Sequence, residues 1–367
     1  MNVKLESDST FQRVQAWMLR DTGRAGVKKV SGINAAIATD VGVKRSQNQD
    51  RAVIVRGIDS YGDIFLLAIV CDGMGGMQDG EYCAATTISA FLSSFFKLSQ
   101  GAGMPNDWLM DSAILANKVI YDRYYGAGGA TLSALLVKSG GKKANWINVG
   151  DSRIYKFGEA GLSQITNDDT IAGQLGKPDA LSQRTSELLQ YIGIGEVLEP
   201  HVSRMTEVDA AVMLISSDGV HYLPTETMAA LVARADDTAS CARRLVEVAK
   251  WCGGHDNATV TVVDVESVYN WKGMSILPGQ YDIWDSFGEL QIFDSFVAVK
   301  KVAREVESYL EKEKKPLPND EAKRVRKVFK ISKEKARLKF ENERDIKSEP
   351  KPEKLPQLKI SFPTKDE

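Results

Sequence analysis

The 367-residue chain predicts an α+β protein built on antiparallel sheets. Three observations predict this class. Strand-like and helix-like stretches alternate between residues 31 and 266, several apolar runs rich in branched residues are typical of buried strands, and very short glycine-containing connections separate the strands of residues 132–165. Connections this short join antiparallel neighbours, so residues 132–165 are expected to form a meander rather than parallel crossovers.

The expected elements follow one another in a regular order. Strands are predicted where apolar residues run between turns, and helices where small or periodic apolar residues extend over ten or more positions. A segment without strand pattern, residues 167–200, is expected to be a surface flap. The strands are expected over residues 32–38, 50–56, 66–71, 132–137, 144–149, 152–157, 162–165, 212–217 and 258–263, and the helices over residues 83–96, 107–124, 225–235 and 239–252.

Composition restricts the class of protein. With 43% hydrophobic and 26% charged residues, the chain resembles ordinary soluble proteins, and it carries no apolar stretch long enough to span a bilayer and no signal-peptide pattern. Four cysteines without CxxC spacing favour reduced core thiols. We therefore expect a cytoplasmic protein that does not contact membranes.

The net charge of -2 conceals an asymmetry. Residues 300–367 hold 21 Lys and Arg against 14 Asp and Glu, a net charge of +7, which leaves -9 for residues 1–299. A two-metal nuclease would need a basic groove in the body, and the acidic body argues against it. Nucleic acid is not expected to bind the tail either, because acidic residues interleave with the basic ones there.

Three apolar runs each end in an aspartate followed by a small residue: Asp72, Asp151 and Asp218. A fourth aspartate, Asp256, directly precedes the strand that starts at Ala258. A carboxylate at the end of a buried strand must pair, bind metal or regain water, so four of them suggest one shared cation site. With only three histidines in the chain, these hard oxygen ligands suit Mg²⁺ or Mn²⁺ better than zinc.

Two further motifs lie near this pattern. The turn of residues 44–51 contains Arg45, which could grip a phosphate in bidentate fashion, and Asp50. The glycine-rich corner of residues 72–76 would let the backbone approach a metal closely. Taken alone, the first motif is more typical of a solvated loop, and the second leaves a simple tight turn as the alternative.

The motifs in order resemble the bacterial branch of the metal-dependent serine/threonine protein phosphatases, the type 2C (PPM) family. The resemblance covers about residues 31–266 and implies a four-layer αββα sandwich, two antiparallel sheets flanked by helices. The residues that carry it are Asp40-Val41-Gly42, Arg45, Asn48-Gln49-Asp50, Val70 to Gly76, Gly80-Glu81, Gly129-Ala130-Thr131, Val149 to Tyr155, Thr166-Asn167-Asp168, Ser217-Asp218-Gly219 and Asp256 to Val260.

The resemblance also implies roles for individual residues. Asp72 corresponds to the ligand that bridges two metals, and Gly73 to the residue that offers its carbonyl to the second metal. Arg45 corresponds to the arginine that grips the phosphate, and Asp50 to the carboxylate that orients metal-bound water. The remaining ligands implied are Asp218 and Asp256 for the first metal, and Asp151, with Asp218 shared, for a third.

The implied reaction is hydrolysis of phosphoserine or phosphothreonine in proteins, opposing a serine/threonine kinase. A hydroxide that bridges two of the two or three Mn²⁺ or Mg²⁺ ions attacks phosphorus directly. The alternative is a weakly active or inactive phosphatase fold that binds phosphoproteins or a kinase as a regulatory partner.

Two positions depart from the family pattern. Gln49 stands where many members have glutamate; its amide could still bind metal through a water, but the lost charge should weaken the second site. Met74 stands where eukaryotic members have a histidine, so a metal-bound water is expected to protonate the leaving group.

The flanking segments lie outside the resemblance. We expect residues 1–30 to be an N-terminal extension and residues 267–297 an aromatic connecting segment, which either covers the body or docks a second protein. Residues 298–343 are expected to form a basic helical hairpin that recruits a kinase, its substrate or an assembly partner. Residues 344–367 should be a disordered tail with a docking peptide near its end.

Overall fold

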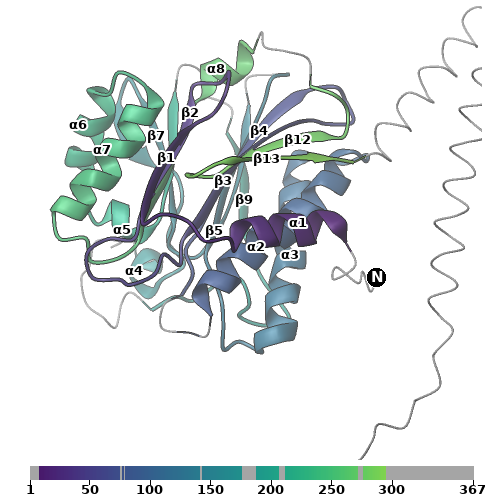
Figure 1. Cartoon of the computed structure of the whole chain (residues 1–367), viewed down its shortest axis with the longest axis horizontal. Coiled ribbons are helices and arrows are strands. Elements are labelled where there is room, and N and C mark those ends of the chain that lie inside the picture. The colour runs from purple at the N-terminus through teal and green to yellow at the C-terminus, as the bar shows by residue number, and fades with distance from the viewer. Residues whose placement is uncertain are drawn as a thin grey trace, which may run out of the picture. The chain divides into compact units, whose positions relative to one another are not determined.

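The computed structural model describes residues 8–74, 77, 79–140, 143–175, 187–205, 211–271 and 276–294 (Figure 1). The chain divides into two compact units, residues 1–302 and 303–367, and all described residues belong to the first. The expected hairpin of residues 298–343, the expected tail of residues 344–367 and part of the glycine-rich corner lie outside the described residues.

Two antiparallel sheets form the centre of the first unit, as the sequence predicts (Figure 1). Every pair of neighbouring strands runs antiparallel. The first sheet has the order β1 (Ala25–Lys29), β2 (Ala35–Asp40), β11 (Ala258–Asp264), β10 (Val212–Ser216), β7 (Arg153–Gly158), β8 (Gly161–Gln164). The second has the order β13 (Glu289–Phe293), β12 (Gln280–Trp284), β3 (Arg51–Ile58), β4 (Ile64–Cys71), β5 (Leu132–Lys138), β6 (Ala144–Val149), β9 (His201–Met205).

Helices cover the outer face of each sheet and complete four layers (Figure 1). On the second sheet lie α1 (Ser9–Met18), α2 (Gly80–Ser99) and α3 (Pro105–Tyr124), and on the first lie α6 (Thr225–Ala233) and α7 (Thr238–Trp251). Three apolar cores separate these layers, one between the two sheets and one under each set of helices. The short helices are α4 (Ile171–Gln174), α5 (Asp218–His221) and α8 (Val265–Tyr269). No helix among the residues described here is long and apolar enough to cross a bilayer.

The prediction that residues 132–165 form a single meander is wrong at one corner. Strands β5 and β6 pair with each other, and so do β7 and β8, but β6 and β7 belong to different sheets. The chain crosses between sheets at Gly150, whose φ of +100° favours glycine and whose added Cβ would lie 2.7 Å from Thr131 Cγ2. Short connections therefore allowed a sheet crossing as well as a hairpin, and this crossing carries Asp151.

Segments on both sides of residues 31–266 are part of the sandwich. Strand β1 pairs with β2, helix α1 packs on α2, and β12 extends the second sheet by pairing with β3. Tyr281 on β12 is buried and stacks on Phe96 with ring centroids 3.8 Å apart. Both flanking segments thus contribute to the same cores as the central region.

Candidate metal centre

Strand directions bring the predicted aspartates to one edge of the sandwich. In the second sheet β4 and β6 run in the same direction on either side of β5, so Asp72 and Asp151 follow strands that end at the same edge. In the first sheet the end of β10 pairs with the start of β11, which brings Asp218 and Asp256 together. Antiparallel pairing explains why Asp256 precedes its strand while the other three follow theirs.

The centre of this edge is a pair of half-buried aspartates. Asp72 and Asp218 lie close enough for each to influence the pKa of the other. Burial raises the pKa of Asp72 well above its ordinary value, and the negative charges of Asp50, Asp218, Asp151 and Asp256 raise it further. Burial raises the pKa of Asp218 to about 6, with a further contribution from Asp256.

Two more carboxylates share this electrostatic field. Burial raises the pKa of Asp50 to about 7, partly offset by a hydrogen bond from the Ser217 hydroxyl, whose Oγ lies 2.7 Å from Asp50 Oδ2. The pKa of Asp151 is also raised to about 7, first by burial and then by the charges of Asp218 and Asp168. All four of these acidic groups at this edge therefore have pKa values above the ordinary value for aspartate.

The donor set fits divalent cations. Asp50 Oδ1 and Asp218 Oδ1 are buried, and neither has a hydrogen-bond partner in the described part of the chain. No three Asp, Glu, His or Cys side chains among those residues converge tightly enough to form a preassembled ligand set. Mg²⁺ usually binds through one or two carboxylates and keeps several waters, so a loose cluster with unpartnered oxygens suits it and the similar Mn²⁺.

Asp256 is placed differently from the other expected ligands. Its Oδ2 lies 2.6 Å from Arg45 Nη2, and its Oδ1 accepts a hydrogen bond of 2.8 Å from the amide of Asn257. The bond to Asp256 raises the pKa of Arg45, and the charges of Asp218 and Asp72 act in the same direction. The expected phosphate-binding residue and an expected metal ligand are thus partners in this structure.

The position of Gly73 accepts only glycine. A Cβ added there would lie 2.3 Å from the Gly80 carbonyl oxygen and 2.7 Å from the Gln49 carbonyl oxygen. The side chain of Gln49 also lies close to Gly80. The backbone that is expected to face the second metal is therefore packed against Gln49, the residue that departs from the family pattern.

Sequence reasoning assigned no role to several residues that support this edge. The Asn257 side chain accepts from the Gln49 amide at 2.8 Å and donates to the carbonyls of Val41 and Gln47 at 2.8 and 2.9 Å. Ser217 orients Asp50, as described above. Both residues directly adjoin an expected ligand, and that adjacency was the signal available in the sequence.

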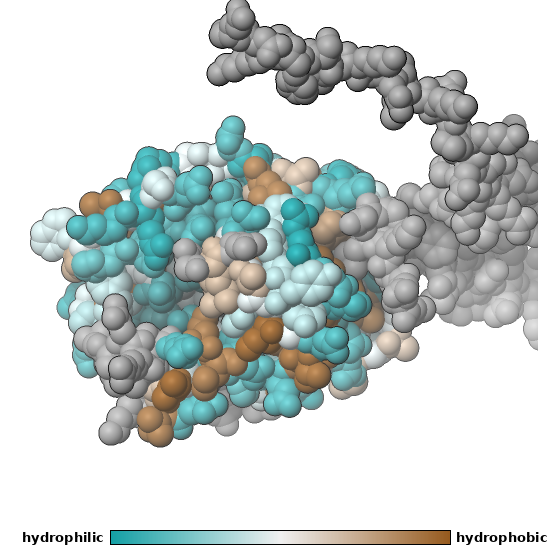
Figure 2. Space-filling view, turned by 90° about the horizontal axis from the view of Figure 1, so that it is seen from below, coloured by the Kyte–Doolittle hydropathy of each residue, from teal (hydrophilic) through white to brown (hydrophobic). Residues whose placement is uncertain are grey.

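Figure 2 shows the molecule of Figure 1 as it is seen from below. Hydrophilic residues cover most of this face, and one band of apolar residues crosses it (Figure 2).

Comparison with known proteins decides the family. No family model matches the chain. The solved structure of the PPM Ser-Thr phosphatase MsPP from Mycobacterium smegmatis is 30% identical in sequence with a TM-score of 0.54, and the match covers 64% of this chain and 99% of that one. The chain belongs to the PPM, or type 2C, family of metal-dependent serine/threonine protein phosphatases. The resemblance seen in the sequence is confirmed, and so is the enzyme class.

Other bacterial relatives of this phosphatase agree. A protein phosphatase 2C-type of Streptococcus pyogenes serotype M6 is 27% identical over 250 residues, which are 63% of this chain and 97% of the relative. The serine/threonine protein phosphatase PstP of Mycobacterium tuberculosis is 28% identical over 256 residues, 66% of this chain and 47% of PstP. The solved serine/threonine phosphatase of S. agalactiae is 25% identical with a TM-score of 0.55, covering 63% of this chain and 98% of that one.

Proposed function

We propose that this phosphatase removes phosphate from phosphoserine and phosphothreonine in proteins and thereby opposes a serine/threonine kinase. Two divalent cations, Mn²⁺ or Mg²⁺, would hold the hydroxide that attacks phosphorus directly. The observation that carries the proposal is the cluster of acidic groups near Arg45, in which Asp50 Oδ1 and Asp218 Oδ1 are buried without a hydrogen-bond partner among the described residues.

The proposed ligands are those that the family resemblance implies. Asp72, at the centre of the mutual repulsion, would bridge two cations, with the Gly73 carbonyl as a further ligand of the second. Asp218 and Asp256 would complete the first site, and Asp151 would hold a third cation together with Asp218. Gln49 would contribute to the second site only through a water.

The chain's own groups have separate tasks in this scheme. Arg45 would bind the phosphate oxygens of the substrate, which requires it to leave Asp256 and so frees that carboxylate for a cation. Asp50, fixed by Ser217 through one oxygen, keeps Oδ1 free to accept a hydrogen bond from the attacking water. Phosphate binding by Arg45 and cation binding by Asp256 would then favour each other.

A partner for the C-terminal segment follows from charge rather than from structure. Residues 300–367 carry +7 against -9 for the remainder. We propose that the basic segment 298–343 recruits the kinase, its substrate or a larger assembly to the enzyme.

The test is hydrolysis of p-nitrophenyl phosphate and of a phosphothreonine peptide with Mn²⁺, using wild type, Asp72→Asn and Asp218→Asn. Wild type should turn over both substrates, and each variant should lose activity on both. If all three are equally inactive across metals, the catalytic proposal is wrong and the alternative of a phosphoprotein-binding module is favoured.

A further inference from the structure

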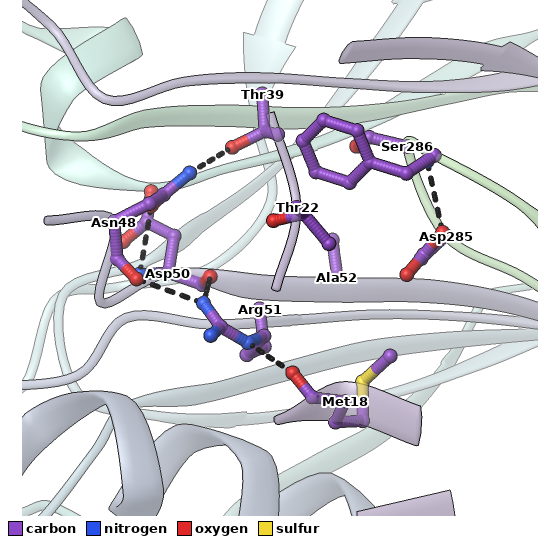
Figure 3. Close-up of a pocket in the computed structure, with 10 residues that line it drawn as sticks. Met18, Thr22, Thr39, Asn48, Asp50, Arg51, Ala52, Asp285 and Ser286 are labelled. Carbon is purple, nitrogen blue, oxygen red and sulfur yellow. Dashed lines mark hydrogen bonds between the residues drawn. The ribbon is translucent and has the colours of Figure 1, made fainter. Parts of the chain in front are cut away.

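Arg51 directly follows Asp50 and binds the main chain around it. Its Nη1 donates to the carbonyls of Asn48 and Asp50 at 2.8 and 2.7 Å, and its Nε donates to the carbonyl of Met18 at 2.8 Å (Figure 3). Its Nη2 forms an ion pair with Glu81. One largely buried guanidinium therefore fixes the turn that presents Asp50.

The partners of Arg51 come from three separate segments. Met18 is the last residue of α1, which lies outside residues 31–266. Glu81 lies in the first turn of α2, directly after Gly80, whose carbonyl closes on Gly73. Arg51 thus connects the N-terminal helix, the Asp50 turn and the Gly73 corner through a single side chain.

A small cavity behind Asp50 shows how the flanking segments reach this turn. It has a volume of about 30 Å³ and is lined by Asp50, Arg51 and Thr39 on one side and by Met18 and the turn at Asp285 on another (Figure 3). A volume of this size accommodates only one or two waters. The wall behind the Asp50 turn is therefore built from segments on both sides of residues 31–266.

The two flanking segments are also tied to each other. Arg20, just after α1, forms an ion pair of 2.7 Å with Asp285 and donates to the carbonyl of Trp17 at 2.6 Å. Asp285 Oδ1 accepts from the amides of Phe287 and Gly288 at 2.8 Å each, which closes the turn between β12 and β13. The end of α1 that Arg51 grips is consequently held in place.

We infer that Arg51 is a positioning residue that sets the location of Asp50 from the end of α1, so that the N-terminal helix is part of the catalytic apparatus. The inference rests on the proposed function, which gives Asp50 its role. Displacing a catalytic group by about 1 Å can lower a rate about 100-fold, so a main-chain anchor at this turn should act on kcat rather than on substrate affinity.

Strand β3 supplies a matched control. Arg56 lies in the same strand, forms an ion pair of 2.6 Å with Asp282 and donates to the carbonyl of Ser31 at 3.1 Å. Its side chain is 13% exposed, against 12% for Arg51. The two arginines are thus similarly buried and each forms an ion pair and main-chain hydrogen bonds, but of the two only Arg51 contacts the Asp50 turn.

The experiment compares Arg51→Lys with Arg56→Lys in the full chain. Lysine retains the charge but loses the planar fork that bonds several carbonyls at once. We expect Arg51→Lys to lower kcat for p-nitrophenyl phosphate about 30-fold with KM changed less than about threefold. Arg56→Lys should lower the unfolding temperature by about as much as Arg51→Lys does, but it should leave kcat within about twofold of wild type.

A second measurement does not depend on turnover. Hydrogen exchange of the metal-free proteins should show faster exchange at residues 48–51 in Arg51→Lys and unchanged exchange there in Arg56→Lys. If Arg51→Lys does not fold, Glu81→Gln, which leaves the three main-chain bonds of Arg51 in place, should lower kcat a few-fold without changing KM.

Equal kcat in the two lysine variants, or unchanged exchange at residues 48–51 in Arg51→Lys, would overturn the inference. An inactive wild type would instead overturn the proposed function, while the exchange comparison would still decide whether Arg51 fixes the turn.

Discussion

Carboxylates with shifted pKa values occur in two very different settings in this molecule. At the strand-end edge, Asp72 and Asp218 face each other and other acidic groups, and their pKa values are raised. On β12, burial also opposes ionisation of Asp282, but hydrogen bonds from Gln291 and Gln280 and the partner Arg56 lower its pKa below the ordinary value.

Burial opposes ionisation in both settings and is the largest cause of the raised pKa values at the edge, but only Asp282 has partners that outweigh it. Asp168, another buried carboxylate, lies 2.8 Å from Arg153 Nη2 and 2.9 Å from its Nε. Several acidic groups gather at the edge, and among the described residues Arg45 is the cation that forms an ion pair with one of them, Asp256. Asp168 and Asp282 each have an arginine of their own. This accumulation of acidic groups at one edge is the reason why we propose that the cations bind there.

The largest expected effect separates the two settings directly. Asp72→Asn and Asp218→Asn should each lower kcat on a phosphothreonine peptide at least about 1000-fold, since a lost metal ligand removes stabilisation of the transition state. Removing one of several repelling charges should leave the unfolding temperature of the metal-free protein unchanged or higher. Steady-state kinetics and calorimetry measure the two effects.

The control for that prediction is Asp282→Asn. It leaves Arg56 without its charged partner and should lower the free energy of unfolding by about 3 kcal/mol while kcat is retained. Equal destabilisation by all three substitutions would show that the edge is an ordinary structural network.

Arg45→Ala should lower kcat/KM on the phosphothreonine peptide about 10-fold to 100-fold, because charge-assisted hydrogen bonds to phosphate are lost. It also releases Asp256, so less Mn²⁺ should be needed for half-maximal activity. A Mn²⁺ titration of the residual activity checks the second part. A higher Mn²⁺ requirement would show that Arg45 does not compete with cations for Asp256.

Stability should depend on pH in a direction set by the raised pKa values. Asp50 and Asp151 have pKa values of about 7 in the folded chain against 3.8 ordinarily, so the folded state binds more protons than the unfolded state between these values. The contribution of these two groups to the free energy of unfolding is therefore most favourable at low pH. The metal-free protein should lose stability as pH rises from about 4 to 7.

Denaturant unfolding across that range, with and without Mn²⁺, checks this prediction. Saturating Mn²⁺ should remove the decline, because the cations compensate the ionised carboxylates. If the stability of the metal-free protein instead rises steadily from pH 4 to pH 7, the pKa values of Asp50 and Asp151 are not raised in the folded chain.

The smallest expected effect is at Gln49. Gln49→Glu restores the charge that many family members have and should lower the Mn²⁺ concentration for half-maximal activity a few-fold with little change in kcat. Gln47→Glu, on the same turn, is the control for added charge alone. Equal shifts in both variants would show that Gln49 has no specific place near the second cation.

Local pattern was sufficient to predict much of the fold. The run 144–149 coincides with β6, and the helix expected over residues 107–124 lies within α3, because burial and periodicity act over neighbouring residues. The crossing at Gly150 was not predicted, since a tight turn joins strands of one sheet or of two with the same residues.

The candidate site was predictable as a set of aspartates but not as a set of partners. Strand ends signalled Asp72, Asp151 and Asp218, whereas the ion pair between Arg45 and Asp256 joins residues 211 positions apart. The contact between Arg51 and Met18 likewise depends on how α1 packs, which local sequence does not encode. Long-range contacts decide such pairings.

The central claim is that the acidic edge binds divalent cations. Its most direct test is to measure the unfolding temperature of the full chain as a function of Mn²⁺ concentration at pH 7.5, for wild type and Asp218→Asn. A ligand at 100 times its dissociation constant stabilises the folded state by about 2.7 kcal/mol. The unfolding temperature of wild type should therefore rise by about 5 to 10 °C, and that of the variant far less. An unfolding temperature of wild type that does not change with Mn²⁺, together with phosphopeptide hydrolysis that persists in chelator, would contradict the account.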